Sequence, residues 1–90
     1  MVRYYAMAKG RIQGVGFRYY IYKLAGSYGL TGWVHNCADG SVDMEIQGKE
    51  SHVEAFFAAV EAGDHFIRVD SLDKKRIACK KEETQFGVVF

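Results

Sequence analysis

The sequence predicts an α+β fold in which two helices cover one face of an antiparallel sheet. Segments with the two-residue alternation of strands and segments with the spacing of amphipathic helices follow one another in the order β-α-β-β-α-β. Glycines or turn pairs separate most of these segments. The 90 residues are enough for one domain, residues 1–90, and the 49% that are hydrophobic are enough for its core.

The first strand is expected over residues 2–9, where apolar and other residues alternate. A helix is expected from about Phe17, because apolar residues then recur at helical spacing as far as Tyr28. Gly29 suits the left-handed conformation that ends many helices.

Residues 30–36 and 41–47 predict the second and third strands, joined by a turn at Asp39 and Gly40. The third strand has the clearest alternation in the chain. Its inward residues are expected to be Val42, Met44 and Ile46, and its outward residues Asp43, Glu45 and Gln47.

The second helix is expected to begin with a capping box, in which Ser51 is the N-cap and Glu54 reaches back to it. It should end near Ala62, before Gly63. The fourth strand lies within residues 66–77, with Ile67, Val69 and Leu72 facing inward, and a short fifth strand is expected over residues 86–90. This order is that of the ferredoxin-like, or split β-α-β, arrangement.

Composition argues against several classes of partner. The net charge is +1, from 12 basic and 11 acidic residues, so nothing favours nucleic acid or an acidic membrane. No apolar run approaches the ~20 residues of a membrane span, and the N-terminus lacks the apolar core of a secretory signal. We therefore expect a cytoplasmic protein. Cys37 and Cys79 should be free thiols, since they follow strands on opposite sides of the sheet.

The stretch between the first strand and the first helix carries the strongest functional signal. Three glycines, Gly10, Gly14 and Gly16, fall within seven residues. Backbone amides around such a turn, beside a helix N-terminus, form a site for an anion. Arg18 adds a planar cation that can hold two phosphate oxygens. The stretch lacks the third glycine of the dinucleotide motif and the Lys-Ser or Lys-Thr pair of the P-loop, so nucleotide binding of either kind is disfavoured.

Asn36 is the second candidate. It ends the second strand, and in this topology that strand end and the glycine loop can lie at the same edge of the sheet. Arg18 and Asn36 can then face one pocket, while His35 points to the opposite face. No His, Cys or carboxylate set has metal-ligand spacing or a catalytic-triad pattern, so no metal and no cofactor are predicted.

Two motifs resemble the signatures of the acylphosphatases. Residues 10–18 resemble the first signature, G-x-V-Q-G-V-x-F-R, with isoleucine in place of the first valine. Residues 32–48 resemble the second, G-[aromatic]-V-x-N-x-x-x-G-x-V-x-x-x-x-x-G. The resemblance extends over essentially all 90 residues, with mild departures at Ala8, Ile12 and His35 and no proline after the second helix.

This resemblance implies a hydrolase of small acyl phosphates that releases inorganic phosphate, needs no cofactor and is a monomer. Arg18 would bind the phosphoryl group, and Asn36 would orient the attacking water. The phosphoryl group would also contact backbone amides of Gln13, Gly14, Val15, Gly16, Phe17 and Arg18. A carboxylate is a good leaving group, so positioning and charge stabilisation can carry most of the catalysis.

Two alternatives remain open on the sequence alone. The same loop would serve a non-catalytic phosphate-binding or regulatory domain. An RNA-binding module shares the β-α-β-β-α-β order, and residues 86–90 resemble its aromatic motif. That motif belongs on the third strand, however, where this chain has Asp43 and Glu45, and the near-neutral charge also argues against RNA.

Overall fold

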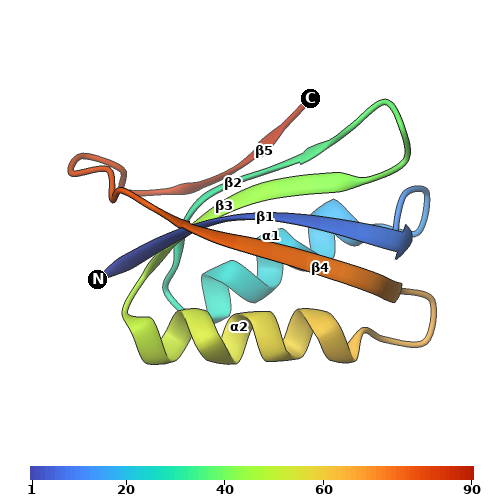
Figure 1. Cartoon of the computed structure of the whole chain (residues 1–90), viewed down its shortest axis with the longest axis horizontal. Coiled ribbons are helices and arrows are strands. Elements are labelled where there is room, and N and C mark those ends of the chain that lie inside the picture. Colours follow the sequence, from blue (N-terminus) through green and yellow to red (C-terminus); the bar gives the residue numbers. More distant parts are fainter.

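Two helices cover one face of a five-stranded sheet in the computed structural model, which describes residues 1–90 (Figure 1). Along the chain the elements are β1 (Val2–Arg11), α1 (Phe17–Ser27), β2 (Thr31–Asn36), β3 (Val42–Gly48), α2 (Glu50–Ala62), β4 (Arg68–Ile77) and β5 (Phe86–Val89). The predicted ferredoxin-like α+β fold is confirmed. Neither helix has the length and apolar composition needed to cross a lipid bilayer.

The strands are ordered β4-β1-β3-β2-β5 in the sheet. The first four pair antiparallel, as predicted, whereas β5 runs parallel to β2 and makes the sheet mixed.

Because β2 and β4 lie on opposite sides of the β1–β3 pair, Cys37 and Cys79 are far apart, and both are free thiols as expected.

The core lies between the sheet and the helices. The inward residues predicted for β3 are fully buried there, together with Ala6 and Ala8 of β1. The helices contribute Phe17, Ile21, Ala25, Val53, Phe56, Phe57 and Val60. Tyr4 meets the ring of Phe57 edge to face, with 5.9 Å between the ring centroids.

A β-bulge in β4 explains how Val69 and Leu72 both pack against the core although they are three positions apart, an odd offset that would place them on opposite faces of a regular strand. Lys9 pairs with Ser71 and Gly10 with Val69, so Asp70 is the extra residue and the alternation shifts there. Gly10 has φ 144°, and a β-carbon at this position would collide with the backbone carbonyl of Arg68. The close approach of the two backbones therefore requires glycine.

The predicted capping box is wrong. Helix α2 begins at Glu50 with Lys49 as its N-cap, two residues before the predicted N-cap, and no side chain caps it. The Lys49 carbonyl accepts hydrogen bonds from the amides of His52 and Val53, each at 3.0 Å. Ser51 therefore already lies inside the first turn, exposed to solvent. The predicted end at Gly63 is confirmed.

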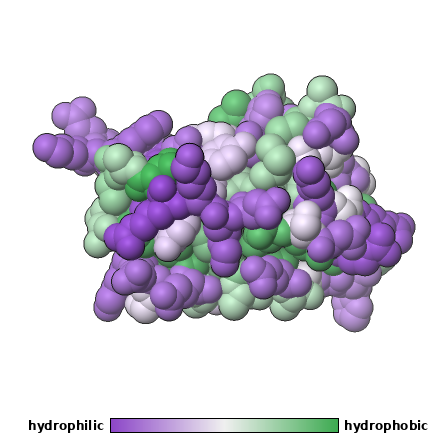
Figure 2. Space-filling model, viewed as in Figure 1, coloured by the Kyte–Doolittle hydropathy of each residue, from purple (hydrophilic) through white to green (hydrophobic).

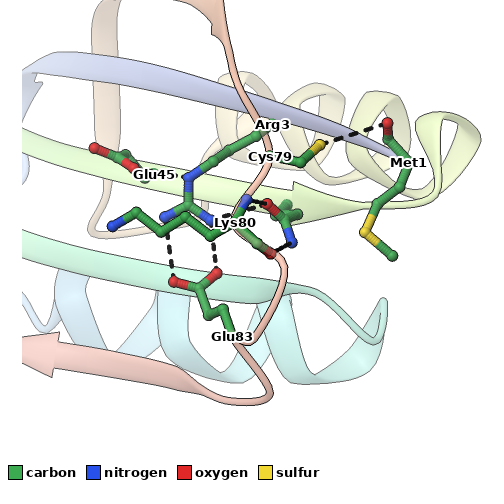
Figure 3. Close-up of polar contacts among 7 residues, drawn as sticks. Met1, Arg3, Glu45, Cys79, Lys80 and Glu83 are labelled. Atoms are coloured by element: carbon green, nitrogen blue, oxygen red, sulfur yellow. Dashed lines mark hydrogen bonds and ion pairs between the residues drawn. The ribbon is translucent and has the colours of Figure 1, made fainter.

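A buried arginine lies on the open face of the sheet. Arg3 is fully buried, its Nε is 2.7 Å from Glu45 Oε1 and its Nη1 is 2.7 Å from Glu83 Oε1 (Figure 3). Gln47 faces outward as predicted but is also buried, because its amide exchanges hydrogen bonds of 2.7 and 2.8 Å with the backbone of Lys80. These contacts fasten the loop of residues 78–85 across β1 and β3.

The same loop projects hydrophilic side chains from one end of the molecule. Figure 2 shows them at the end where Figure 1 places the connection between β4 and β5. Within the loop Lys80, Lys81 and Glu82 are exposed, whereas Glu83 is half-buried against Arg3. Burial alone would raise the pKa of the Glu83 carboxyl, but its hydrogen bond and ion pair with Arg3 outweigh burial and lower that pKa.

Replacing Glu83 with glutamine should destabilise the fold, because Arg3 stays buried and loses one of its two carboxylate partners. A hydrogen bond to a charged group contributes about 1.5–3 kcal/mol, and we expect a loss of that size at neutral pH. Since the folded pKa of Glu83 lies below the unfolded value, its contribution is full at neutral pH and is lost as pH falls through the folded pKa.

Urea unfolding at neutral and acidic pH measures this difference. The difference in the free energy of unfolding between wild type and Glu83→Gln should decrease as the solution is acidified. Glu82→Gln is the matched control, since Glu82 is exposed and should change stability little. An equal loss in both variants would mean that the loop, rather than the Arg3 contact, responds to the lost charge.

Candidate active site

Three strand ends meet beside the N-terminus of α1. Strands β1 and β2 both run antiparallel to β3, so they point in the same direction, and β5 is parallel to β2. The loop after β1, the turn after β2 and the C-terminus all lie toward this end of the sheet (Figure 1). The predicted meeting of the glycine loop with the end of β2 is therefore found in the structure.

The loop between β1 and α1 is held in one conformation by glycine and by a glutamine. Gly14 and Gly16 have φ 79° and 80°, values that other residues rarely adopt, and open space surrounds both positions. Glycine is needed there for its conformation rather than for room. The Gln13 side-chain amide donates to the carbonyls of Cys37 and Ser41, at 2.7 and 2.9 Å. The loop is thereby tied to the turn that follows Asn36.

The N-terminus of α1 is free to attract an anion. Its N-cap is Gly16, which has no side chain to cap the helix, and its first turn contains no acidic residue. The first amides of a helix lack partners within the helix, and the helix dipole makes this end positive. The loop amides and the first turn of α1 therefore favour a negatively charged group.

Arg18, in the first turn, is oriented by the C-terminal segment. Its Nη1 donates to the Val89 carbonyl at 3.3 Å, and its guanidinium lies over the Phe90 ring, 4.7 Å from the centroid. The segment is placed there because β5 pairs with β2, with Val89 opposite His35. The sequence pattern predicts the strand over residues 86–90 but not its part in the site, because no local signal reveals parallel pairing with β2.

Arg18 and Asn36 line one cavity of about 390 Å³. Arg18 provides the only charged side chain in its lining. The lining residues are Ile12, Gln13, Gly14, Gly16, Phe17, Arg18, Tyr19, Asn36, Val88 and Phe90. Of the residues predicted for phosphate binding, Val15 alone does not line it, and lies instead at a neighbouring hollow beside Tyr20 and Ile67.

The side-chain carbonyl of Asn36 is buried and has no hydrogen-bond partner. Asn36 follows Gly32 and Val34 on the buried, helix-facing side of β2. An unsatisfied buried acceptor costs about 1–3 kcal/mol, so such groups are normally paired. A donor that enters the cavity, such as a water molecule, would remove this cost.

His35 lies on the opposite face of the sheet, as predicted. Its Nδ1 is 3.0 Å from Asp43 Oδ1, and the Tyr5 hydroxyl donates to Asp43 Oδ2 at 2.9 Å. Burial and this hydrogen bond raise the pKa of Tyr5 to about 12. His35 is therefore no candidate for a base in the cavity, whose lining contains no histidine, aspartate or glutamate side chain.

Comparison with known proteins agrees with this geometry. The acylphosphatase family model matches residues 4–88. The acylphosphatase of Clostridium acetobutylicum is 41% identical over 90 residues, covering 100% of this chain and 99% of the relative. The crystal structure of acylphosphatase from Bacillus subtilis superposes with a TM-score of 0.94 at 33% identity, covering 100% of each chain.

The same domain is similar to part of a much larger protein. The crystal structure of T.kodakarensis HypF matches 100% of this chain with a TM-score of 0.86 and 28% identity, and the match covers 12% of the HypF chain. The family model and the full-length relatives together show that this chain belongs to the acylphosphatase family.

Proposed function

We propose that this protein hydrolyses the carboxyl-phosphate bond of small acyl phosphates to a carboxylate and inorganic phosphate. Family membership and the names of the full-length relatives support this reaction class. The observation that carries the proposal is the unpartnered, buried Oδ1 of Asn36 in the same cavity as Arg18. The Asn36 carbonyl could accept a hydrogen bond from a water molecule, and the Arg18 guanidinium could bind the phosphoryl group that the water would attack.

In the proposed mechanism the phosphoryl group binds to the loop amides and to the guanidinium of Arg18. The attacking water donates a proton to a hydrogen bond with Asn36 Oδ1, which turns an oxygen lone pair toward phosphorus. Attack forms the new P–O bond as the bond from phosphorus to the acyl oxygen breaks. The acyl group leaves as its carboxylate, and the protons of the water remain on the released phosphate.

This reaction places modest demands on proton transfer. The leaving carboxylate is already a weak base, so it departs without being protonated. The charge on the equatorial phosphoryl oxygens faces fixed amides and a permanently charged arginine, which need little reorganisation during the reaction. The Gln13 contacts and the Phe90 ring hold the loop and Arg18 in place before substrate arrives.

The direct test is hydrolysis of benzoyl phosphate by the purified protein. Turnover would support an enzyme. Binding of phosphate without turnover would instead identify a non-catalytic phosphate-binding domain, because the loop and Arg18 would serve that role equally well.

Asn36→Ala should lower kcat far more than it raises KM, since a group that orients water acts mainly in the transition state. We expect a loss of about 2.7–4 kcal/mol, or about 10²–10³ in kcat, the range for removal of one well-placed polar group. Gln85→Ala, which removes an exposed amide outside the cavity, is the control and should keep its activity. If Asn36→Ala weakens only substrate binding, Asn36 is a substrate contact and not the water ligand.

Arg18→Gln should reduce kcat/KM by more than about tenfold and remove phosphate binding, because it deletes the only charged side chain that lines the cavity. At a hundred times its Kd, phosphate should stabilise the wild type by about 2.7 kcal/mol. Each kcal/mol is worth roughly 4–8 °C in Tm for a domain near this size, so thermal unfolding measures the effect readily.

Arg11→Gln is the matched control for Arg18, since Arg11 is exposed and does not line the cavity. Arg11→Gln should keep both turnover and the rise in Tm that phosphate causes. Asn36→Ala should keep the rise in Tm but lose turnover. Chloride at equal ionic strength should give no shift. An equal phosphate shift in wild type and Arg18→Gln would show a general salt effect and would remove the proposed anion site.

Phe90→Ala should lower kcat/KM by about two- to fivefold, corresponding to the ~0.5–1 kcal/mol of an exposed cation–π contact. Phe90→Tyr keeps the ring and should restore most of this loss. Steady-state kinetics of the two variants would measure the difference. Equal activity in wild type and Phe90→Ala would mean that the Val89 carbonyl alone holds Arg18 in place.

A further inference from the structure

Three side chains with metal-binding atoms converge on the open face of the sheet, at the end of β2. His35 Nδ1 lies 3.0 Å from Asp43 Oδ1 and 4.0 Å from Cys37 Sγ, and the three ligand atoms lie within 4.8 Å of one another. The backbone dictates this meeting. His35 and Asp43 are directly opposite in the β2–β3 register, and Cys37 follows two residues after His35.

We propose that His35, Cys37 and Asp43 bind a divalent transition-metal ion of the Zn²⁺ type. An imidazole nitrogen, a thiolate and a carboxylate are the ligands that Zn²⁺ prefers, whereas Mg²⁺ and Ca²⁺ prefer oxygen ligands alone. The thiolate and the carboxylate together balance the two charges of the ion. This surface lies on the other side of the sheet from the cavity and is independent of the proposed hydrolysis.

The distances suit a small ion. Metal–ligand bonds of about 2.0–2.3 Å in a tetrahedral site separate the donor atoms by roughly 3.3–3.6 Å. The distances of 3.0 and 4.0 Å bracket this range, so small rotations of the side chains would complete the site. Three protein ligands leave a fourth position for water.

A second layer of contacts already orients one ligand. The Tyr5 hydroxyl holds Asp43 Oδ2, which leaves Oδ1 directed toward His35. Ligating carboxylates in metal sites are characteristically fixed by hydrogen bonds of this kind. The Asp43 side chain is 17% exposed and that of His35 38%, so the cluster is sheltered but open to an ion from solution.

The test is titration of chelator-treated wild-type protein with Co²⁺, followed by displacement with Zn²⁺ in calorimetry. We expect one ion per chain and the charge-transfer absorption of a thiolate–cobalt bond. Cys37→Ser should lose that absorption, and Cys37→Ser and His35→Gln should each weaken Zn²⁺ binding by more than about tenfold. Tyr5→Phe should weaken binding by about tenfold with all three ligands retained, as expected for a lost outer contact.

Cys79→Ser is the matched control, because it removes the other thiol, which lies outside the cluster. It should bind Co²⁺ and Zn²⁺ like the wild type. Unchanged Zn²⁺ affinity in Cys37→Ser, or thiolate absorption that is lost in Cys79→Ser, would overturn the proposal.

A measurement on the wild type removes any dependence on how the variants fold. Zn²⁺ should slow alkylation of Cys37 by iodoacetamide and leave that of Cys79 unchanged, as peptide mass spectrometry can resolve. Mg²⁺ at the same concentration should protect neither thiol. Equal alkylation of Cys37 with and without Zn²⁺ would refute the site.

Discussion

The guanidinium of Arg3 connects parts of the chain that are far apart in the sequence, and the shape of the proposed active site depends on it. Through Glu83 and Gln47 it fastens the loop of residues 78–85 across the open face of the sheet. That loop brings the chain from β4 at one edge to β5 at the other. Strand β5 in turn places Phe90 against Arg18. The buried ion pair between Arg3 and Glu83 on the open face of the sheet thus helps to position Arg18, which lies at the end of the helix-covered face.

The catalytic proposal rests on rigidity more than on reactive groups. Gln13 links the glycine loop to the turn after Asn36, so the anion site and the water site belong to one connected unit. Burying Arg3 and leaving the Asn36 carbonyl without a partner both cost free energy, but only the first is compensated within the protein. The second cost is left for a ligand to remove, which is what a binding site requires.

Local patterns predicted the fold and the placement of Arg18 and Asn36 at one cavity, because strand alternation, helical spacing and glycine turns are local signals. They failed where the outcome depends on residues distant in sequence. Nothing near Val88 or Phe90 indicates the parallel pairing with β2, and the bulge at Asp70 is apparent only from the β1 register. The capping box at Ser51 matched a motif, but the N-cap of the helix lies two residues earlier, at Lys49. No local spacing indicates the cluster of His35, Cys37 and Asp43, because Asp43 comes from the next strand.

Strand β4 forms one edge of the sheet, where another copy of the protein could pair with it. Strand β4 is an edge strand ten residues long, and exposed edges of this kind can template edge-to-edge aggregation. Here Lys74, Lys75 and Arg76 follow one another along it, all exposed, and the bulge at Asp70 interrupts its regular pairing geometry. A second β4 brought alongside would meet this exposed charged run and a ladder interrupted by the bulge. The bulge that brings Gly10 close to the Arg68 backbone is therefore also a feature that disfavours edge-to-edge pairing between copies.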